Sequence, residues 1–167
     1  MKVPVFGVLY DENEQSNLID VARKFWLTSG KYTAELEQKF EEYLGCEKFF
    51  TVCSGSSANL LMFSTLGLPK ESEVILPAVC FPTMVSPVIQ LGLTPVFVDV
   101  ELNSLNIDPE KISEAVGEKT EAIFILHNLG NPCDSSLSWW SNKFTLLEDV
   151  CDALGSSNCG TWGAMSS

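Results

Sequence analysis

Ala122-Ile123-Phe124-Ile125-Leu126 is a continuous apolar run that stops at His127, and runs of this kind decide the fold class. Its β-branched and aromatic residues favour a strand, and its unbroken apolarity indicates a strand that is buried on both faces. Similar short runs occur at four other places: 49–53, 74–76, 95–98 and 144–147. Strands buried on both faces are typical of a parallel sheet covered by helices, so the sequence predicts an α/β fold.

Helical patterns fill the segments before and between these runs. Asp11 and Glu14 form a capping-box pattern ahead of helical spacing over 18–26, and a second pattern over 36–44 stops at Gly45. Three later segments are expected to be helical as well: 82–92, 108–117 and, as a short helix, 135–140. We therefore expect an N-terminal helical segment over residues 1–45 and a larger α/β domain over residues 46–167.

Composition limits the classes of partner. The 167 residues are 46% hydrophobic and carry a net charge of −12, which opposes binding to nucleic acid or to an anionic membrane. No apolar stretch is long enough to span a bilayer, and the N-terminus lacks the apolar core of a signal peptide, so we expect a soluble, cytoplasmic protein that binds a small molecule. The six cysteines lack the spacing of a metal site, so reduced thiols and no bound metal are expected.

The residues that follow the predicted strands are the candidates for a binding site, because ligands of open parallel sheets bind beyond the carboxyl ends of the strands. The first of these segments is Ser54-Gly55-Ser56-Ser57-Ala58-Asn59, in which free amides and hydroxyl groups at a helix start suit a phosphate. Phe81 follows the second strand and Asp149 follows the last. A phosphate cradle, an aromatic ring and a carboxylate together suit pyridoxal phosphate, whose protonated ring nitrogen needs an acidic partner.

Each of these features also has a purely structural interpretation. The serine-rich turn alone is typical of a helix cap, and Phe81 alone is typical of a core residue. Asp149 alone could cap the next turn, and His127, the single histidine, could be a hydrogen-bonded structural residue. Only the combination of these features, in this order, favours a cofactor site.

Several segments together resemble the DegT/DnrJ/StrS family of sugar aminotransferases, and more closely its nucleotide-sugar 3-dehydrase branch, which acts on substrates such as CDP-4-keto-6-deoxyglucose. The segments that carry the resemblance are Trp26-Leu27-Thr28-Ser29-Gly30, Ser54-Gly55-Ser56-Ser57-Ala58-Asn59, Phe81-Pro82-Thr83, His127-Asn128-Leu129-Gly130-Asn131-Pro132 and Glu148-Asp149-Val150-Cys151-Asp152-Ala153-Leu154-Gly155. The resemblance implies part of the large domain of the type I fold of pyridoxal-phosphate-dependent transferases. It also implies a homodimer.

The resemblance also implies roles for single residues. Gly55, Ser56 and Ser57 would hold the cofactor phosphate, and Phe81 would stack on the pyridine ring. Asp149 would pair with the ring nitrogen, and Asp152 falls where many relatives carry a glutamine near the phenolic oxygen of the cofactor. The candidates for binding the nucleotide-linked sugar are Trp26, Thr28, Ser29 and His127.

One departure from the family concerns catalysis. In relatives, a serine-phenylalanine element follows the segment that corresponds to Gly160-Thr161-Trp162-Gly163, and after it comes the lysine that binds the cofactor covalently, or a histidine in the dehydrases. No lysine or histidine follows Asp149 in this chain. We therefore expect an N-terminal fragment without the C-terminal small domain, with no catalytic residue of its own and weak or absent binding of pyridoxal or pyridoxamine phosphate.

The sequence thus predicts the N-terminal part of a dehydrase that removes the 3-hydroxyl group of a nucleotide-linked 4-keto-6-deoxyhexose, a step of deoxysugar and O-antigen synthesis in lipopolysaccharide, with or without a reductase partner. Two alternatives remain. One is a sugar aminotransferase of the same family, and the other is a binding or dimerising module without catalysis.

Overall fold

The structure, a computed structural model, describes residues 7–156 and 164–166 of the chain. The turn expected over Gly160-Thr161-Trp162-Gly163 lies outside the described residues, as does Cys159. The chain divides into two compact units, Met1–Thr51 and Val52–Ser167. The division follows Thr51, whereas the sequence suggested a boundary after residue 45.

The first unit consists of two helices, α1 (Glu12–Lys24) and α2 (Lys31–Leu44). The predicted capping box is present, because the Asp11 side chain accepts a hydrogen bond from the Asn13 amide at 2.6 Å while Glu14 accepts one from the Asp11 amide at 2.7 Å. Helix α2 ends at Gly45, which has a left-handed φ of 66° that glycine adopts without strain. Both predicted helices are therefore confirmed, α1 with its capping box and α2 with its terminal glycine, although α1 ends at Lys24, before Phe25 and Trp26 of the predicted pattern.

The expected strand over residues 49–53 is wrong, because the structure has no strand there. The Phe49 ring instead stacks on Phe40 of α2 with a centroid distance of 4.6 Å. The Thr51 amide and hydroxyl both donate to the Glu37 carboxylate of the same helix, at 2.9 and 2.8 Å. Phe49 and Thr51 are thus held against α2, whereas Phe50 and Val52 are 70% and 41% exposed.

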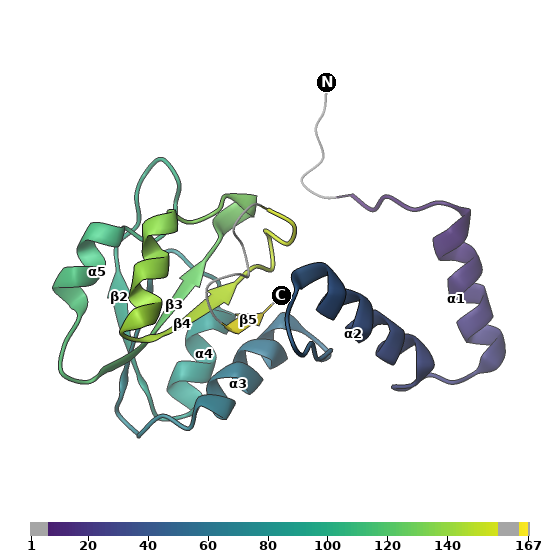
Figure 1. The fold of residues 1–167 in the computed structure, drawn as a ribbon, viewed down its shortest axis with the longest axis horizontal. Coiled ribbons are helices and arrows are strands. Elements are labelled where there is room, and N and C mark those ends of the chain that lie inside the picture. The colour runs from purple at the N-terminus through teal and green to yellow at the C-terminus, as the bar shows by residue number, and fades with distance from the viewer. Residues whose placement is uncertain (1–6, 157–163, 167) are drawn as a thin grey trace. The chain divides into compact units, whose positions relative to one another are not determined.

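The second unit contains a five-stranded parallel sheet with the order β2-β1-β3-β4-β5 (Figure 1). The strands are β1 (Glu73–Pro77), β2 (Thr94–Val98), β3 (Thr120–Leu126), β4 (Thr145–Asp149) and β5 (Ala164–Ser166). The four longer strands confirm the predicted runs, and the parallel α/β class is confirmed with them. The sequence analysis missed β5, which has only three residues.

Helices connect the strands and cover the sheet. They are α3 (Gly55–Leu66), α4 (Pro82–Gln90), α5 (Pro109–Ala115), the short 3₁₀ helix η1 (Asn128–Gly130) and the 3₁₀ helix η2 (Ser135–Asn142). Pro82 and Pro109 begin their helices, where a missing amide hydrogen costs nothing.

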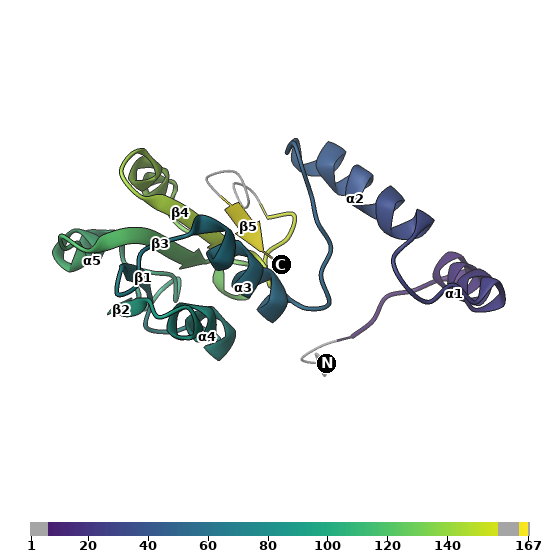
Figure 2. The ribbon, with the colours of Figure 1, turned by 90° about the horizontal axis from the view of Figure 1, so that it is seen from below.

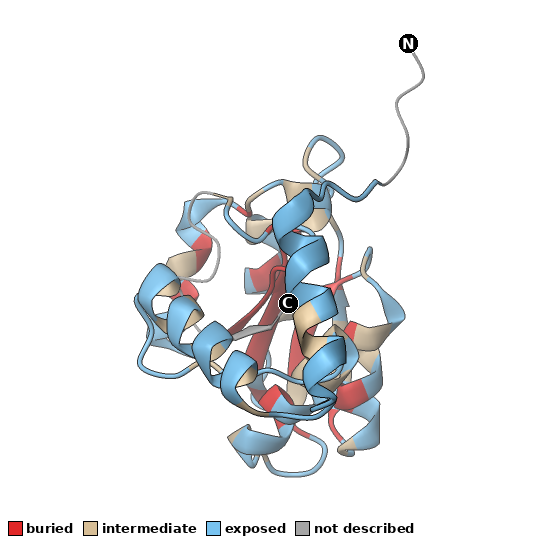
Figure 3. Ribbon diagram, turned by 90° about the vertical axis from the view of Figure 1, so that its right-hand side faces the viewer, coloured by how far each residue is buried: buried red, intermediate tan, exposed pale blue. Residues whose placement is uncertain are grey.

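Two apolar clusters lie on opposite faces of this sheet because side chains alternate along a strand. Phe124 belongs to the cluster under α3 and α4, whereas its neighbours Ile123 and Ile125 belong to the cluster under α5 and η2. Figure 2 shows α3 and α4 side by side on one side of the sheet. Buried positions are concentrated in the strands, and the helices turn exposed surfaces outward (Figure 3). The alternation continues to the end of β4, so Glu148 and Asp149 face opposite sides of the sheet.

Within residues 7–156 and 164–166, no helix is both long and apolar enough to cross a lipid bilayer.

Candidate functional site

Asp149 is the last residue of β4 and lies at the carboxyl edge of the sheet, where β1 and β3 also end. Its side chain faces the side covered by α3 and α4 and is only 6% exposed. One carboxylate oxygen, Oδ1, accepts the Cys151 amide at 3.0 Å, and the other, Oδ2, accepts the Asn59 side-chain amide at 3.1 Å. Asp149 therefore does cap the next turn, but only one of its two oxygens is used for this.

Within residues 7–156 and 164–166, no cation pairs with the Asp149 carboxylate. None of the ion pairs among the described residues includes Asp149, and both of its side-chain hydrogen bonds come from neutral groups. A nearly buried carboxylate of this kind is the residue type that binds a cationic group of a ligand. Each oxygen keeps a further lone pair for such a group.

Burial and the negative charge of Asp149 both affect the pKa of two nearby thiols, Cys80 and Cys151. Burial raises the pKa of the Cys80 thiol, and the negative charge of Asp149 raises it further. The pKa of the Cys151 thiol is raised by burial, then by Asp149 and by Asp152. Asp149 therefore lies within electrostatic range of both thiols, and Asp152 within electrostatic range of Cys151.

Asn59 is a site residue that the sequence analysis did not single out. It is 1% exposed, and its amide bridges from α3 to the end of β4, which is 90 residues away in the sequence. A signal for it was present, because Asn59 lies three and four residues before Met62 and Phe63, the other buried residues of α3. A polar residue on the apolar face of a helix is a buried group that requires partners.

The first turn of α3 leaves donors for an anion. Ser54 caps the helix by accepting the Ser57 amide at 3.3 Å, which agrees with the capping interpretation of this turn. Among the described residues, the amides of Gly55 and Ser56 have no hydrogen-bond acceptor, nor does the Ser56 hydroxyl. The cap and a bound phosphate would use different donors, so the capping bond does not exclude phosphate binding at this turn.

Ser57 differs from Ser56 because its hydroxyl already has partners. It accepts a hydrogen bond from the Ser54 hydroxyl at 3.2 Å and lies 3.1 Å from the Cys53 sulfur. Hydrogen bonding lowers the pKa of the exposed Cys53 thiol, with the larger effect from Ser57 and the smaller from Ser54.

Phe81 and Asp152 are both exposed, at the ends of the segments that follow β1 and β4. Phe81 is 69% exposed directly before α4, which excludes the alternative of a core residue. Asp152 lies in the turn after β4, near Cys151. Both side chains are accessible to a ligand at this edge.

His127 is in the interior, so the expectation that it contacts a substrate is corrected. Its side chain is fully buried, its Nδ1 accepts the Cys133 amide at 3.0 Å, and its Nε2 lies 3.0 Å from Glu148 Oε2. Because Nδ1 accepts a hydrogen bond, the ring proton is on Nε2 and is donated to the Glu148 carboxylate. His127 holds the loop after β3 against β4, on the face opposite Asp149.

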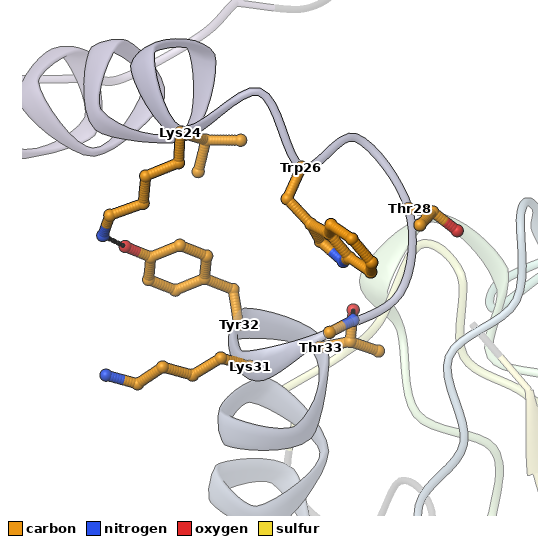
Figure 4. Close-up of a pocket in the computed structure, with 8 residues that line it drawn as sticks. Lys24, Trp26, Thr28, Lys31, Tyr32 and Thr33 are labelled. Atoms are coloured by element: carbon orange, nitrogen blue, oxygen red, sulfur yellow. Dashed lines mark hydrogen bonds between the residues drawn. The ribbon is translucent and has the colours of Figure 1, made fainter.

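Three of the four candidate sugar-binding residues, Trp26, Thr28 and Ser29, lie in the first unit, which has a hollow of about 420 Å³ (Figure 4). Trp26 and Thr28 line it, and the Trp26 indole nitrogen donates to the Ser29 carbonyl at 2.9 Å. Gly30 is required below the indole, since a Cβ atom there would lie 2.8 Å from the Trp26 nitrogen. The turn thus fixes one indole orientation at the wall of the hollow.

Lys24 and Tyr32 also line this hollow and were not predicted. The Lys24 ammonium donates to the Tyr32 hydroxyl at 2.8 Å (Figure 4). It also donates to Asp20 at 2.6 Å, and these bonds, with Asp20 as the larger cause, raise the Lys24 pKa. The hollow therefore combines aromatic walls with two lysines, Lys24 and Lys31, of which Lys24 is held by Asp20 and Tyr32. In the sequence, Lys24 is the last residue of one helix and Tyr32 lies in the first turn of the next. These positions indicate only weakly that the two side chains meet.

The parallel sheet and its connections have the fold of the pyridoxal-phosphate-dependent aminotransferases. A solved structure described as Escherichia coli GDP-4-keto-6-deoxy-D-mannose-3-dehydratase with bound hydrated PLP has a TM-score of 0.84 and 35% identity, over 89% of this chain and 40% of that one. The model of the DegT/DnrJ/EryC1/StrS aminotransferase family matches residues 9–167. The chain belongs to this family.

Two curated relatives are similar over most of this chain. The Salmonella typhimurium lipopolysaccharide biosynthesis protein RfbH is 42% identical over 92% of this chain and 38% of its own length. The dTDP-4-dehydro-2,6-dideoxy-D-glucose 3-dehydratase of Saccharopolyspora spinosa is 40% identical over 92% of this chain and 36% of its own length. The chain therefore spans less than two fifths of the length of these two relatives.

Proposed function

We propose that the complete protein containing this chain is a nucleotide-sugar 3-dehydratase that uses pyridoxal or pyridoxamine phosphate, and that this chain supplies one part of its cofactor site. The similarity to two proteins described as 3-dehydratases supports the reaction. The observation that carries the proposal is the Asp149 carboxylate, which is nearly buried and has no cationic partner among the described residues.

The residues at the sheet edge fit this cofactor. A protonated pyridine nitrogen is a cation that matches the uncompensated charge of Asp149. The amides of Gly55 and Ser56 and the Ser56 hydroxyl, which have no acceptor in the described part of the chain, match a phosphate group. When bound, the cofactor supplies an electron-accepting ring that assists loss of the 3-hydroxyl group.

Each protein group has a limited task in this proposal. Asp149 would keep the proton on the ring nitrogen, and Gly55, Ser56 and Ser57 would hold the phosphate. Phe81 would cover one ring face and exclude water from it, and Asp152 would face the phenolic oxygen. Trp26, Thr28 and Ser29 would contact the sugar nucleotide, whereas His127 would act only by holding its loop.

A sugar aminotransferase is the second candidate, because the matching family model carries that name. Both reactions begin with a nucleotide-linked 4-keto sugar, and they differ in product. A dehydratase gives a 3-deoxygenated sugar, a two-electron reduction for which the electrons would come from the amine of pyridoxamine phosphate, renewed by glutamate, or from a reductase. An aminotransferase uses glutamate as the amino donor and gives an aminated sugar. Mass spectrometry of the product distinguishes the two, and the absence of both products supports a binding module without catalysis.

We extend the proposal to a cytoplasmic homodimer, with or without an electron-donating reductase partner. The resemblance to the family supports the homodimer. Light scattering of the complete protein measures its mass, and addition of a reductase to the assay measures the need for a partner.

The sharpest test of the cofactor site is Asp149→Asn in the complete protein. The amide keeps the shape of the side chain but cannot stabilise a positive ring nitrogen, so we expect a loss of activity of about a hundredfold or more with a retained fold. Turnover of a GDP-linked or dTDP-linked 4-keto-6-deoxyhexose measures the loss, and circular dichroism checks the fold.

Glu110→Gln is the matched control, because it makes the same change of charge at an exposed position of α5. We expect it to leave the turnover unchanged. Full activity of Asp149→Asn with pyridoxal phosphate would contradict the assignment of Asp149.

A further inference from the structure

Asn59 connects three elements of the candidate cofactor site through one side-chain nitrogen. Its Nδ2 atom lies 3.1 Å from Asp149 Oδ2 at the end of β4 and 3.5 Å from the Thr83 carbonyl oxygen in the first turn of α4. Asn59 itself belongs to α3, the helix whose first turn carries the candidate phosphate donors. An amide nitrogen has two hydrogens, so one can be directed to each acceptor.

We propose that Asn59 is the positioning residue that fixes the Asp149 carboxylate for the cofactor ring nitrogen, a role that rests on the proposed function. Asn59 acts through Asp149 and does not itself need to touch the ring.

The carboxylate is held at both oxygens by donors from different parts of the chain. The Cys151 amide fixes Oδ1 from the turn that follows β4, and Asn59 fixes Oδ2 from α3. Rotation of the carboxylate would break at least one of these bonds. Because Asp149 is 6% exposed and Asn59 is 1% exposed, water cannot readily replace the lost donor.

The same amide relates the carboxylate to the other two cofactor-binding segments. The Thr83 carbonyl lies two residues after Phe81, the candidate stacking residue, and Gly55 and Ser56 lie one helical turn before Asn59. Loss of the Asn59 amide therefore frees the carboxylate from both helices. If Asn59 were only a structural residue, its loss would weaken the binding of a ligand equally whether or not the ligand has a ring nitrogen.

The test measures the affinity of the complete protein for two ligands. One is pyridoxal phosphate, and the other is its analogue with carbon in place of the ring nitrogen. We use Asn59→Ala and also Asn59→Leu, which keeps apolar volume beside Met62 and Phe63 if the smaller side chain fails to fold. We expect either variant to weaken binding of pyridoxal phosphate by about tenfold or more and to change binding of the analogue by less than about twofold. In an Asp149→Asn background, Asn59→Leu should cause no further loss of ring-nitrogen preference.

Asn142→Ala is the matched control, because its exposed amide bonds only the Trp139 carbonyl, at 3.0 Å, within η2. It should change the affinity for neither ligand. Equal losses for both ligands in the Asn59 variants would overturn the role of Asn59 alone. A wild-type protein that binds pyridoxal phosphate no more tightly than the analogue would instead overturn the proposed function, and the two failures are thus distinguishable.

Discussion

Cys53 is an exposed thiol beside the two serine hydroxyls that begin α3. Hydrogen bonding by Ser57, and to a smaller extent by Ser54, lowers the pKa of this thiol, so a larger fraction is thiolate near neutral pH than in an ordinary cysteine. Ser57→Ala removes the larger cause, and we expect the pKa to rise toward its ordinary value and alkylation near neutral pH to become slower. The rate of iodoacetamide labelling of Cys53 as a function of pH, followed by peptide mass spectrometry, measures this.

Ser64→Ala is the control for this prediction, because the Ser64 hydroxyl bonds only the Leu60 carbonyl of the same helix. It should leave the pH midpoint of Cys53 labelling where it is. An unchanged midpoint in Ser57→Ala would show that the serine hydroxyl does not act on the thiol.

Single residues of the site were predictable to different degrees. The position of Asp149 at the sheet edge was predictable, because it follows the apolar run 144–147, and the structure makes it the last residue of β4. Asn59 was not singled out, because its importance depends on which face of α3 is buried, and that is decided by packing. His127 was placed in the substrate site because both interpretations give the same position in the sequence, and only the buried contacts of its two ring nitrogens separate them.

At the scale of elements, β3 and β2 differ in how deeply their phenylalanine side chains are buried. Phe124 of β3 is fully buried and makes an edge-to-face contact with Phe63 of α3 at a centroid distance of 5.2 Å, whereas Phe97 of β2 is 53% exposed. We expect Phe124→Ala to lower the free energy of unfolding by about 3–5 kcal/mol and Phe97→Ala by about 1 kcal/mol or less. Urea denaturation of the two variants measures the difference, and comparable losses would contradict the assignment of the core.

The four longer strands were predictable because each is a short apolar run between helices. The run at residues 49–53 has similar composition, yet the Phe40 ring and the Glu37 carboxylate of α2 provide its partners, which a local pattern does not reveal. Strand β5 was missed for the opposite reason. Its three residues, Ala164–Ser166, are not a β-forming run, and its pairing with β4 makes it a strand.

At the scale of the whole molecule, the chain combines a net charge of −12 with many exposed apolar side chains. Neither α1 nor α2, both of which lie within the described residues, contains a buried residue, although each has apolar residues at helical spacing. In the second unit, β2 is an outer strand of the described sheet. Exposed apolar surface and an open strand edge both favour association with other chains.

We therefore expect the 167-residue chain alone to self-associate. The apparent mass measured by light scattering should rise with protein concentration, and it should rise further with added salt, which screens the repulsion between negatively charged chains. A monodisperse monomer over the whole range of concentration and salt would contradict this prediction.

Because Glu148 and Asp149 face opposite sides of the sheet, β4 should not tolerate the insertion or deletion of a single residue. Insertion or deletion of one codon within β4 would exchange the two carboxylates, so that one acid would lose its histidine while the other would turn away from α3. Each carboxylate would then be buried without its present hydrogen-bond donor, which is Asn59 for Asp149 and His127 for Glu148. Length variation among natural homologues should therefore fall in the loops before and after this strand and be absent from the strand itself.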